Sequence, residues 1–129
     1  MPSRPRVLLV DDHPAVVKAL CRVLSAECDV VGVIGDGREV ADAAARLRPV
    51  VIVVDLNLPN ISGLDVCRRI TRNDPRAKII VMTAMPDDAI RDQALAVGAS
   101  GFCNKSAANE LIGAIRRIWT ESSDLAERR

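Results

Sequence analysis

Aromatic side chains are scarce in this chain of 129 residues, in which phenylalanine and tryptophan occur once each and tyrosine is absent. Proteins that bind single-stranded nucleic acid by base stacking need aromatic rings, so the composition disfavours that class. Neither charge predominates, because 18 basic residues are balanced by 17 acidic ones. The charge balance therefore gives no sign of a polyanion binder. The core must be built from valine, isoleucine, leucine and alanine.

Long apolar runs and cysteine motifs are also missing. No apolar run approaches the roughly 18 residues that a membrane-spanning helix needs, and the first residues carry no signal-peptide pattern. We therefore expect a cytoplasmic protein without a membrane partner. The cysteines have no CxxC spacing, which favours reduced, buried thiols over disulfides or a zinc site. They are Cys21, Cys28, Cys67 and Cys103.

The most apolar stretch is residues 50–54, five β-branched residues that end at Asp55. A strand without polar alternation is typical of a parallel sheet covered by helices on both faces. Ligands of open α/β sheets bind at the carboxyl ends of the strands, so Asp55 is a candidate site residue. Aspartate is also common at turns, and a capping role explains Asp55 alone equally well.

Short apolar segments alternate along the chain with segments whose apolar residues recur at helical spacing. This alternation predicts a single α/β domain with a doubly wound five-stranded parallel sheet over residues 1–119, followed by a polar tail or truncated linker, residues 120–129. Right-handed crossovers favour the flavodoxin-like strand order 2-1-3-4-5. Ser106 is a candidate N-cap of the last helix. The expected strands are residues 6–10, 29–34, 50–54, 78–82 and 100–104, and the helical stripes cover 17–24, 40–47, 64–70, 90–97 and 111–119.

Polar residues follow four of the expected strands: Asp11 and Asp12, Asp55, Thr83, and Lys105. A parallel sheet places all of them at one edge. Three carboxylates within a few ångströms repel one another unless a cation holds them, and oxygen ligands suit Mg²⁺. An aspartate can also act as a nucleophile and become an aspartyl phosphate. The threonine hydroxyl and the lysine ammonium suit binding of the phosphoryl group.

These residues together resemble the bacterial response-regulator receiver domain, whose CheY-like fold has the strand order given above. The motif Asp11-Asp12-His13-Pro14 is similar to that of NarL-type (LuxR-like) transcriptional regulators. The resemblance rests on Val-Asp-Asp-His-Pro at 10–14, Val-Asp-Leu-Asn-Leu-Pro at 54–59, Gly63, Thr83-Ala84 and Phe102-Cys103-Asn104-Lys105.

The resemblance implies a role for each residue of the site. Asp55 would be the phosphoacceptor, and Lys105 would pair with the phosphoryl group. Mg²⁺ would be held by Asp12 and Asp55, by Asp11 through water, and by the backbone carbonyl of Asn57. The resemblance implies that Thr83 and Phe102 form a switch pair, and the less favoured alternative for Phe102 is a core aromatic.

We therefore expect a phosphoacceptor signalling domain, not an enzyme. Its phosphodonor would be a sensor histidine kinase or a phosphotransfer protein, and its output would be transcription through a domain of a longer protein. Phosphorylation could also produce a homodimer. This chain alone should not bind DNA, because no helix gathers a basic face. The alternatives are a stand-alone receiver or phosphorelay intermediate that signals by docking and, less favoured, an aspartyl-phosphate phosphatase.

Other interpretations of the motifs are weaker. The glycines of residues 32–37 do not have the GxGxxG spacing of a dinucleotide site. A haloacid-dehalogenase-like phosphatase would need an acid at Asn57, and a flavodoxin-like cofactor binder would need hydroxyl groups after the first strand. His13 is expected to be an exposed loop residue near the site. Ser106 stands where many receivers have proline, and a cis bond without proline costs about 2.5–4 kcal/mol, so the resemblance does not fix this turn.

Overall fold

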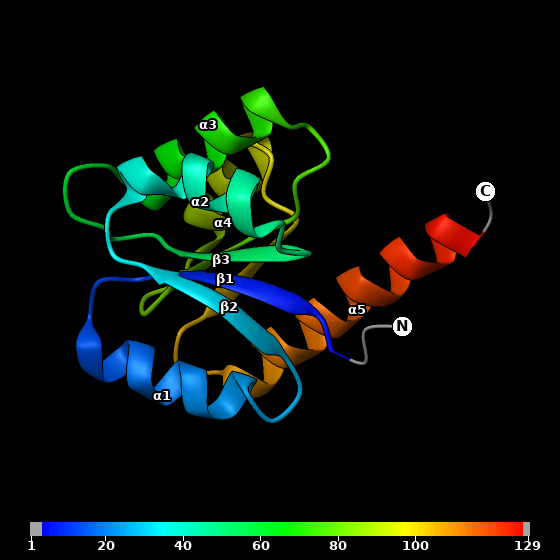
Figure 1. The fold of residues 1–129 in the computed structure, drawn as a ribbon. Coiled ribbons are helices and arrows are strands. Elements are labelled where there is room, and N and C mark those ends of the chain that lie inside the picture. Colours follow the sequence, from blue (N-terminus) through cyan, green and yellow to red (C-terminus); the bar gives the residue numbers. More distant parts are fainter. Residues whose placement is uncertain (1–3, 128–129) are drawn as a thin grey trace.

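Five parallel strands form one sheet in the order β2-β1-β3-β4-β5, as the computed structural model shows (Figure 1). The structure describes residues 4–127, with side chains described as far as Glu121. The strand order 2-1-3-4-5 predicted from the sequence is confirmed, and the strand boundaries agree within one residue. The strands are β1 (Arg6–Val10), β2 (Asp29–Ile34), β3 (Val51–Asp55), β4 (Ile79–Thr83) and β5 (Gly101–Asn104).

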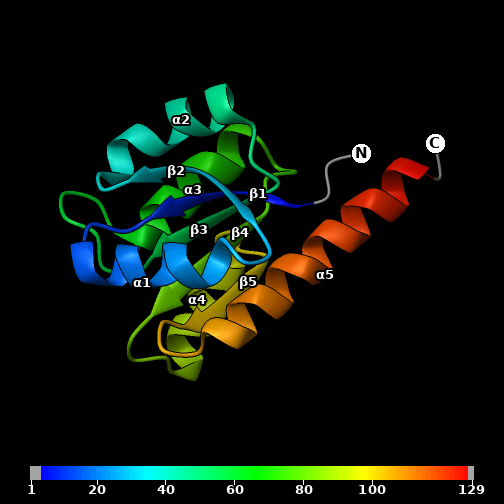
Figure 2. The same ribbon diagram turned by 60° about the horizontal axis from the view of Figure 1, so that its bottom comes forward.

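Helices cover both faces of the sheet. Helices α1 and α5 lie on one face and α2, α3 and α4 on the other, which completes the predicted doubly wound sandwich (Figures 1 and 2). A short 3-10 helix, η1, precedes α2 and was not predicted. The helices are α1 (Pro14–Leu24), η1 (Gly37–Glu39), α2 (Val40–Leu47), α3 (Gly63–Asn73), α4 (Asp88–Ala96) and α5 (Ala108–Glu127).

Alternate residues of each central strand belong to two separate cores. In β1, Val7 and Leu9 pack with residues of α1 and α5, whereas Leu8 and Val10 pack with residues of α2, α3 and α4. Every residue of β3 and β4 is buried. Burial on both faces explains why these strands show no polar alternation.

The cysteines are all free, as predicted: Cys28, Cys67 and Cys103 are buried, and Cys21 is partly exposed. Burial raises the pKa of the Cys67 thiol to about 11, so it stays protonated at neutral pH.

The prediction that Ser106 caps the last helix is wrong. Helix α5 begins at Ala108, and the Ser106 hydroxyl donates to Asn104 Oδ1 at 2.8 Å. The backbone N–H of Ser106 donates to the same oxygen at 3.0 Å, so Asn104 closes a local turn that holds the serine away from the helix. Residues 4–127 contain no cis peptide bond, so the Lys105–Ser106 bond is trans.

Helix α5 continues to Glu127 and projects past the body of the domain (Figures 1 and 2). It therefore includes most of the segment 120–129, whose composition predicts a polar tail. The role of this segment as a linker stays a prediction. Within residues 4–127, no helix is both long enough and apolar enough to cross a bilayer.

Candidate functional site

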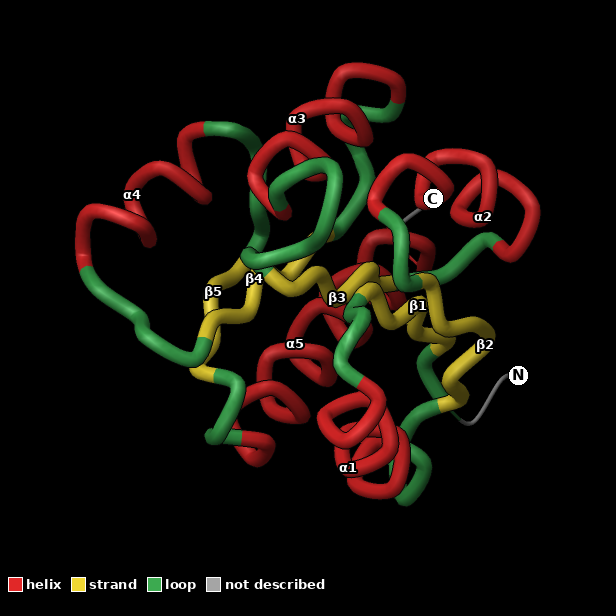
Figure 3. Tube along the Cα trace, turned by 90° about the vertical axis from the view of Figure 1, so that its left-hand side faces the viewer, coloured by secondary structure: helices red, strands yellow, loops and turns green. Residues whose placement is uncertain are grey.

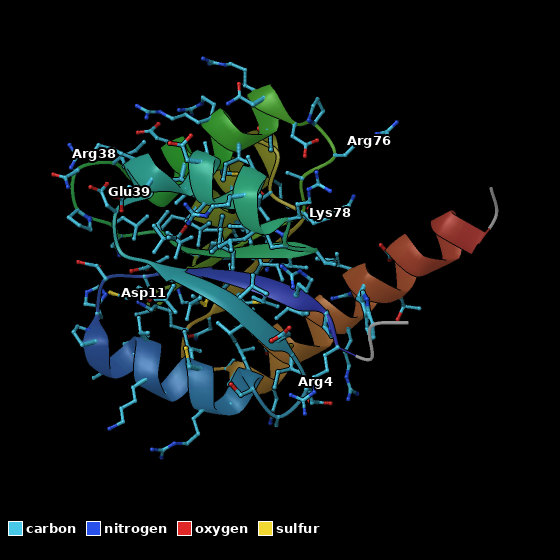
Figure 4. The ribbon with its side chains drawn as sticks, viewed as in Figure 1. Arg4, Asp11, Arg38, Glu39, Arg76 and Lys78 are labelled. Atoms are coloured by element: carbon cyan, nitrogen blue, oxygen red, sulfur yellow. The ribbon has the colours of Figure 1, made fainter. Side chains whose placement is uncertain are left out.

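The predicted site residues meet at the edge of the sheet where the strands end. Figure 3 faces this edge, with α2, α3 and α4 above the row of strands and α1 and α5 below it. In Figure 4 Asp11 lies at this edge, whereas Arg76 and Lys78 lie at the opposite end of the sheet. The structure therefore separates the site from the basic residues that follow α3.

Asp11 and Asp55 lie side by side because β1 and β3 are neighbouring parallel strands. The register pairs Val10 with Val54, and each aspartate follows directly. Both residues are only 1% exposed, whereas Asp12 is exposed to solvent. The two buried carboxylates are therefore close enough to interact strongly in a region from which water is largely excluded.

Lys105 lies between the two buried aspartates. Its Nζ atom is 2.9 Å from Asp11 Oδ2 and 3.2 Å from Asp55 Oδ2, although neither approach has the direction of a hydrogen bond. Burial opposes the charge of Lys105, but the two carboxylates raise the pKa of its ammonium group above the ordinary value. The backbone N–H of Lys105 donates to the Thr83 carbonyl at 2.9 Å, which fixes the start of the loop that carries the lysine.

The two buried carboxyl groups differ in their pKa values. Burial raises the pKa of Asp55, and the neighbouring charge of Asp11 adds to the rise. Burial also disfavours the charged form of Asp11, but contacts with Lys105 and His13 outweigh it and lower the pKa of Asp11. The backbone N–H of Asn57 donates to Asp55 Oδ1 at 3.3 Å.

His13 contacts the site more closely than its sequence position predicts. Its side chain is 52% exposed, but Nδ1 lies 2.9 Å from Asp11 Oδ1, 3.3 Å from Asp12 Oδ1 and 3.5 Å from Asp55 Oδ2. The hydrogen bond to Asp11 is the main cause that raises the pKa of the imidazole. The expectation of an exposed residue near the site is correct, but the three-way contact was missed. Its position directly after two acids, at the start of a helix, was the available signal.

The acidic cluster fits a divalent cation. Asp11, Asp12, His13 and Asp55 each present one ligand atom within 4.8 Å of the others. Asp11 Oδ2 and Asp55 Oδ2 are buried and have no hydrogen-bond partner among the described residues. Both oxygens are paired with Lys105, and carboxylate oxygens clustered in this way suit Mg²⁺, which binds hard oxygen ligands. For Asn57, the structure places the backbone N–H at the site, and metal binding by its carbonyl stays a prediction.

Thr83 and Phe102 lie on neighbouring strands, β4 and β5. Thr83 is 2% exposed, and its hydroxyl accepts from the Met85 N–H at 3.2 Å. The register places Phe102 opposite Val81, two residues before Thr83. Phe102 is half-buried against the core beneath α2, α3 and α4. The two residues thus lie on adjacent strands, and the predicted switch stays a prediction.

Gly63, which the sequence motif singled out, marks a close approach of backbones. A Cβ atom at this position would lie 2.8 Å from Leu56 Cα and 3.0 Å from the carbonyl carbon of Asp55. The Gly63 N–H donates to the Leu56 carbonyl at 2.8 Å. Glycine therefore lets the start of α3 sit directly against the end of β3 and support the loop after Asp55.

A pocket of about 560 Å³ opens beside Asp55. One wall is an apolar strip of α1 that includes Val16, Leu20 and Val23, and the other comes from the loop between β5 and α5. The pocket gives a macromolecule a partly apolar surface next to the buried carboxylate. His13, Asn57, Ala84 and Lys105 line it next to Asp55.

Comparison with known proteins agrees with this geometry. Residues 7–116 match the family model of the response regulator receiver domain. The chain belongs to the response-regulator receiver family. Receiver domains of this family are phosphoacceptor signalling domains, so the resemblance predicted from the sequence motifs is confirmed.

Relatives of this receiver are found among complete response regulators. The response regulator GacA of Pseudomonas protegens is 36% identical over 118 residues, which are 88% of this chain and 55% of GacA. The DNA-binding response regulator MtrA of Mycolicibacterium smegmatis is 37% identical over 122 residues, or 94% of this chain and 53% of MtrA. The receiver thus spans about half the length of these relatives.

A solved structure supports the NarL-type (LuxR-like) assignment. The two-component response regulator of the LuxR family from Aurantimonas sp. SI85-9A1 superposes with a TM-score of 0.87 at 33% sequence identity. The match covers 92% of this receiver and 87% of that chain. The similarity therefore extends over nearly the whole fold described above.

Proposed function

We propose that this receiver accepts one phosphoryl group on Asp55 from a phosphohistidine of a sensor histidine kinase or phosphotransfer protein. A carboxylate oxygen of Asp55 would bond to phosphorus while the phosphorus–nitrogen bond of the donor breaks. The donor imidazole would leave with the bonding electrons and take up a proton from solvent. The observation that carries this proposal is a buried carboxylate at the end of the central strand, 3.2 Å from a lysine ammonium.

The neighbouring side chains suit phosphoryl transfer. Asp11, Asp12 and Asp55, with the carbonyl of Asn57, would hold Mg²⁺, which supplies positive charge to phosphoryl oxygens when bound. Lys105 would exchange its contact with the Asp55 carboxylate for one with the phosphoryl group. Because Lys105 is already held at the site, little rearrangement is needed when charge develops on the phosphoryl oxygens.

Phosphorylation would then act through Thr83 and Phe102. The Thr83 hydroxyl now accepts a hydrogen bond from the Met85 N–H, at the start of the loop before α4. If it turned to donate to a phosphoryl oxygen, this hydrogen bond would break and the loop would move. Phe102 is half-buried on the adjacent strand and could fill the space that Thr83 leaves. This is a shift between two packings of one core.

The pocket beside Asp55 suits a protein donor. Asp55 is buried, so a phosphohistidine must reach it through a surface that excludes water, and the apolar wall of α1 offers one. We infer that the donor is a cytoplasmic protein domain that docks on α1 and the β5–α5 loop.

We further propose that the output is transcription, through a DNA-binding domain of a longer protein. The supporting observations are that MtrA is named a DNA-binding response regulator and that this receiver corresponds to about half of it. Residues 120–129, at the end of α5, would then lead from the receiver to the output domain, and phosphorylation would favour a homodimer.

We expect no turnover of external phosphate esters. Phosphatases that use an aspartate nucleophile need a second acid to protonate the leaving group, and Asn57 next to Asp55 cannot serve as one. Stoichiometric labelling therefore distinguishes a receiver from a phosphatase, whereas sustained release of phosphate from small phosphomonoesters would favour the phosphatase.

The test is phosphorylation from a small phosphodonor. The protein with Mg²⁺ should gain one phosphoryl group by intact mass, and the near-isosteric Asp55→Asn variant should gain none. Asp36→Asn changes a partly buried carboxylate outside the cluster that pairs with Arg38, and this control should be labelled like the wild type. Equal labelling of Asp55→Asn and wild type would refute the proposal.

A further inference from the structure

The only histidine of the chain lies among the acids of the site. His13 Nδ1 is within 3.5 Å of a carboxylate oxygen of each of Asp11, Asp12 and Asp55. Attraction to the carboxylates holds the ring at the acids. The ring makes no capping hydrogen bond at the start of α1, and its exposed position leaves it free to turn away.

The spacing of these atoms matches that of ligands around one ion. Two ligands bound to one cation through bonds of about 2.0–2.1 Å, at angles between a right angle and the tetrahedral angle, lie about 2.9–3.4 Å apart. The distances from Nδ1 to the oxygens of Asp11, Asp12 and Asp55 are 2.9, 3.3 and 3.5 Å. The buried oxygens Asp11 Oδ2 and Asp55 Oδ2 accept no hydrogen bond among the described residues but are paired with Lys105 Nζ at 2.9 and 3.2 Å, so a bound cation would share this place with the ammonium.

We propose that His13 Nδ1 is a ligand of the metal site, which therefore binds cations that accept nitrogen, such as Zn²⁺, in addition to Mg²⁺. This inference rests on the metal site of the proposed function and assigns it a nitrogen donor. Imidazole binds Zn²⁺ and related transition metals well, whereas Mg²⁺ favours oxygen ligands. The three carboxylates thus give the site its affinity for cations, and His13 determines which divalent ions it prefers.

Metal binding requires the proton on His13 Nδ1 to move, to Nε2 when the ring is neutral and to solvent when the ring is an imidazolium. The contact between Nδ1 and Asp11 Oδ1 places the ring proton on Nδ1, because an ionised carboxylate can only accept. In the metal complex, Nδ1 would use its lone pair to bind the ion, and the ring proton would reside on Nε2. The half-exposed ring allows solvent to mediate this transfer.

A single histidine makes this tautomer change directly observable. In long-range ¹H–¹⁵N spectra of the ¹⁵N-labelled chain, one equivalent of Zn²⁺ should shift the Nδ1 resonance and leave the proton on Nε2. Mg²⁺ should cause a much smaller change. Zn²⁺ binding that leaves both ring nitrogens unchanged would overturn the proposal, and so would a failure of the chain to bind Zn²⁺.

Calorimetry of variants tests the effect on selectivity. His13→Ala should lose about tenfold or more in Zn²⁺ affinity and change Mg²⁺ affinity by less than about twofold. Asp12→Asn should weaken binding of both ions. Asp65→Asn, which removes an exposed carboxylate on α3, should affect neither. Equal Zn²⁺ affinities of His13→Ala and wild type would overturn the assignment.

Phosphorylation separates this inference from the proposed function. Asp65→Asn, which leaves the site intact, should accept a phosphoryl group on Asp55 in Mg²⁺ like the wild type. If labelling at Asp55 persists while the Zn²⁺ measurements show no role for His13, only the nitrogen-ligand assignment fails. If Asp55 is never labelled, the proposed function fails, whatever the metal measurements show.

Discussion

Burial and neighbouring charges both determine the pKa of the Asp55 carboxyl group. Burial raises this pKa, and Asp11 adds to the rise, whereas Lys105 and the Asn57 N–H favour the charged form. Among the described residues, Lys105 and, when protonated, His13 are the cations within ion-pair distance of both buried aspartates. The contact of His13 with Asp55 is longer than that of Lys105. The lysine is therefore paired with Asp55 in this structure, and in the proposed mechanism it would exchange this contact for one with the phosphoryl group.

Removing Lys105 should separate phosphorylation from switching. Lys105→Ala should still accept some phosphoryl group, because Asp55 and the metal ligands remain. It should not show the amide chemical-shift changes at Thr83 and Met85 that phosphorylation produces in the wild type. Lys18→Ala, which removes an exposed lysine of α1, is the control and should respond like the wild type. A wild-type response of Lys105→Ala would remove the lysine from the switch.

Helix α3 positions the site through its first residue. At Gly63 the backbone of α3 approaches the end of β3 so closely that a side chain has no room, and the atoms that it would meet belong to the backbone. Backbone atoms of a buried strand cannot move aside as a flexible side chain can. The glycine therefore determines how closely the loop after Asp55 is held to the sheet.

Gly63→Ala should destabilise the fold by about 1–3 kcal/mol and reduce labelling of Asp55, because α3 must shift away from β3. Gly113→Ala in α5 is a matched control, since a Cβ atom there meets nothing within 4 Å. It should stabilise the fold by about 0.5–1 kcal/mol, because alanine favours a helix over glycine. Urea unfolding followed by circular dichroism measures both changes. A neutral Gly63→Ala variant would contradict the role given to this contact.

The strands could be predicted because each one is marked by an apolar run within its own few residues. The β-branched run of β3 and the apolar run of β1 are buried on both faces, so composition alone identified them. The end of α5 was not predicted, because residues 120–127 carry few apolar residues and continue a helix that earlier residues anchor to the sheet. Ser106 was misassigned because Asn104, two residues earlier, competes for its hydroxyl.

The candidate site was predictable for a different reason. Parallel strands bring their carboxyl ends to one edge, so Asp11, Asp55 and Lys105 could be grouped from sequence order alone. The sequence places His13 directly after two acids, but its contact with all three acids depends on the direction in which the side chain leaves the loop, which the sequence does not give. The distances that support the nitrogen-ligand inference therefore needed the structure.

We expect the described part of the molecule to have no surface suited to reading DNA. Its 18 basic and 17 acidic residues nearly cancel, and α1 to α4 turn their apolar stripes toward the sheet. Sequence-specific DNA binding needs a clustered basic face and an element that enters a groove. A transcriptional output would thus require a further domain, as in relatives about twice as long.

These 129 residues, phosphorylated or not, should show no sequence-specific DNA binding at physiological salt. Gel shifts with a set of promoter fragments and a scrambled duplex of equal length test this expectation. Weak binding that is equal for all duplexes and disappears as salt increases would agree with it. A salt-resistant complex with one sequence would contradict the account of the receiver as a domain without its own DNA-binding surface.

The central claim is that Asp55, and not another acid of the cluster, carries the phosphoryl group. The most direct measurement is borohydride reduction of the phosphorylated protein, which converts an aspartyl phosphate to homoserine, followed by peptide mass spectrometry. Homoserine is expected at position 55 alone, and none is expected in Asp55→Asn. Homoserine at position 11 or 12 of the wild type, or its absence from position 55, would contradict the claim.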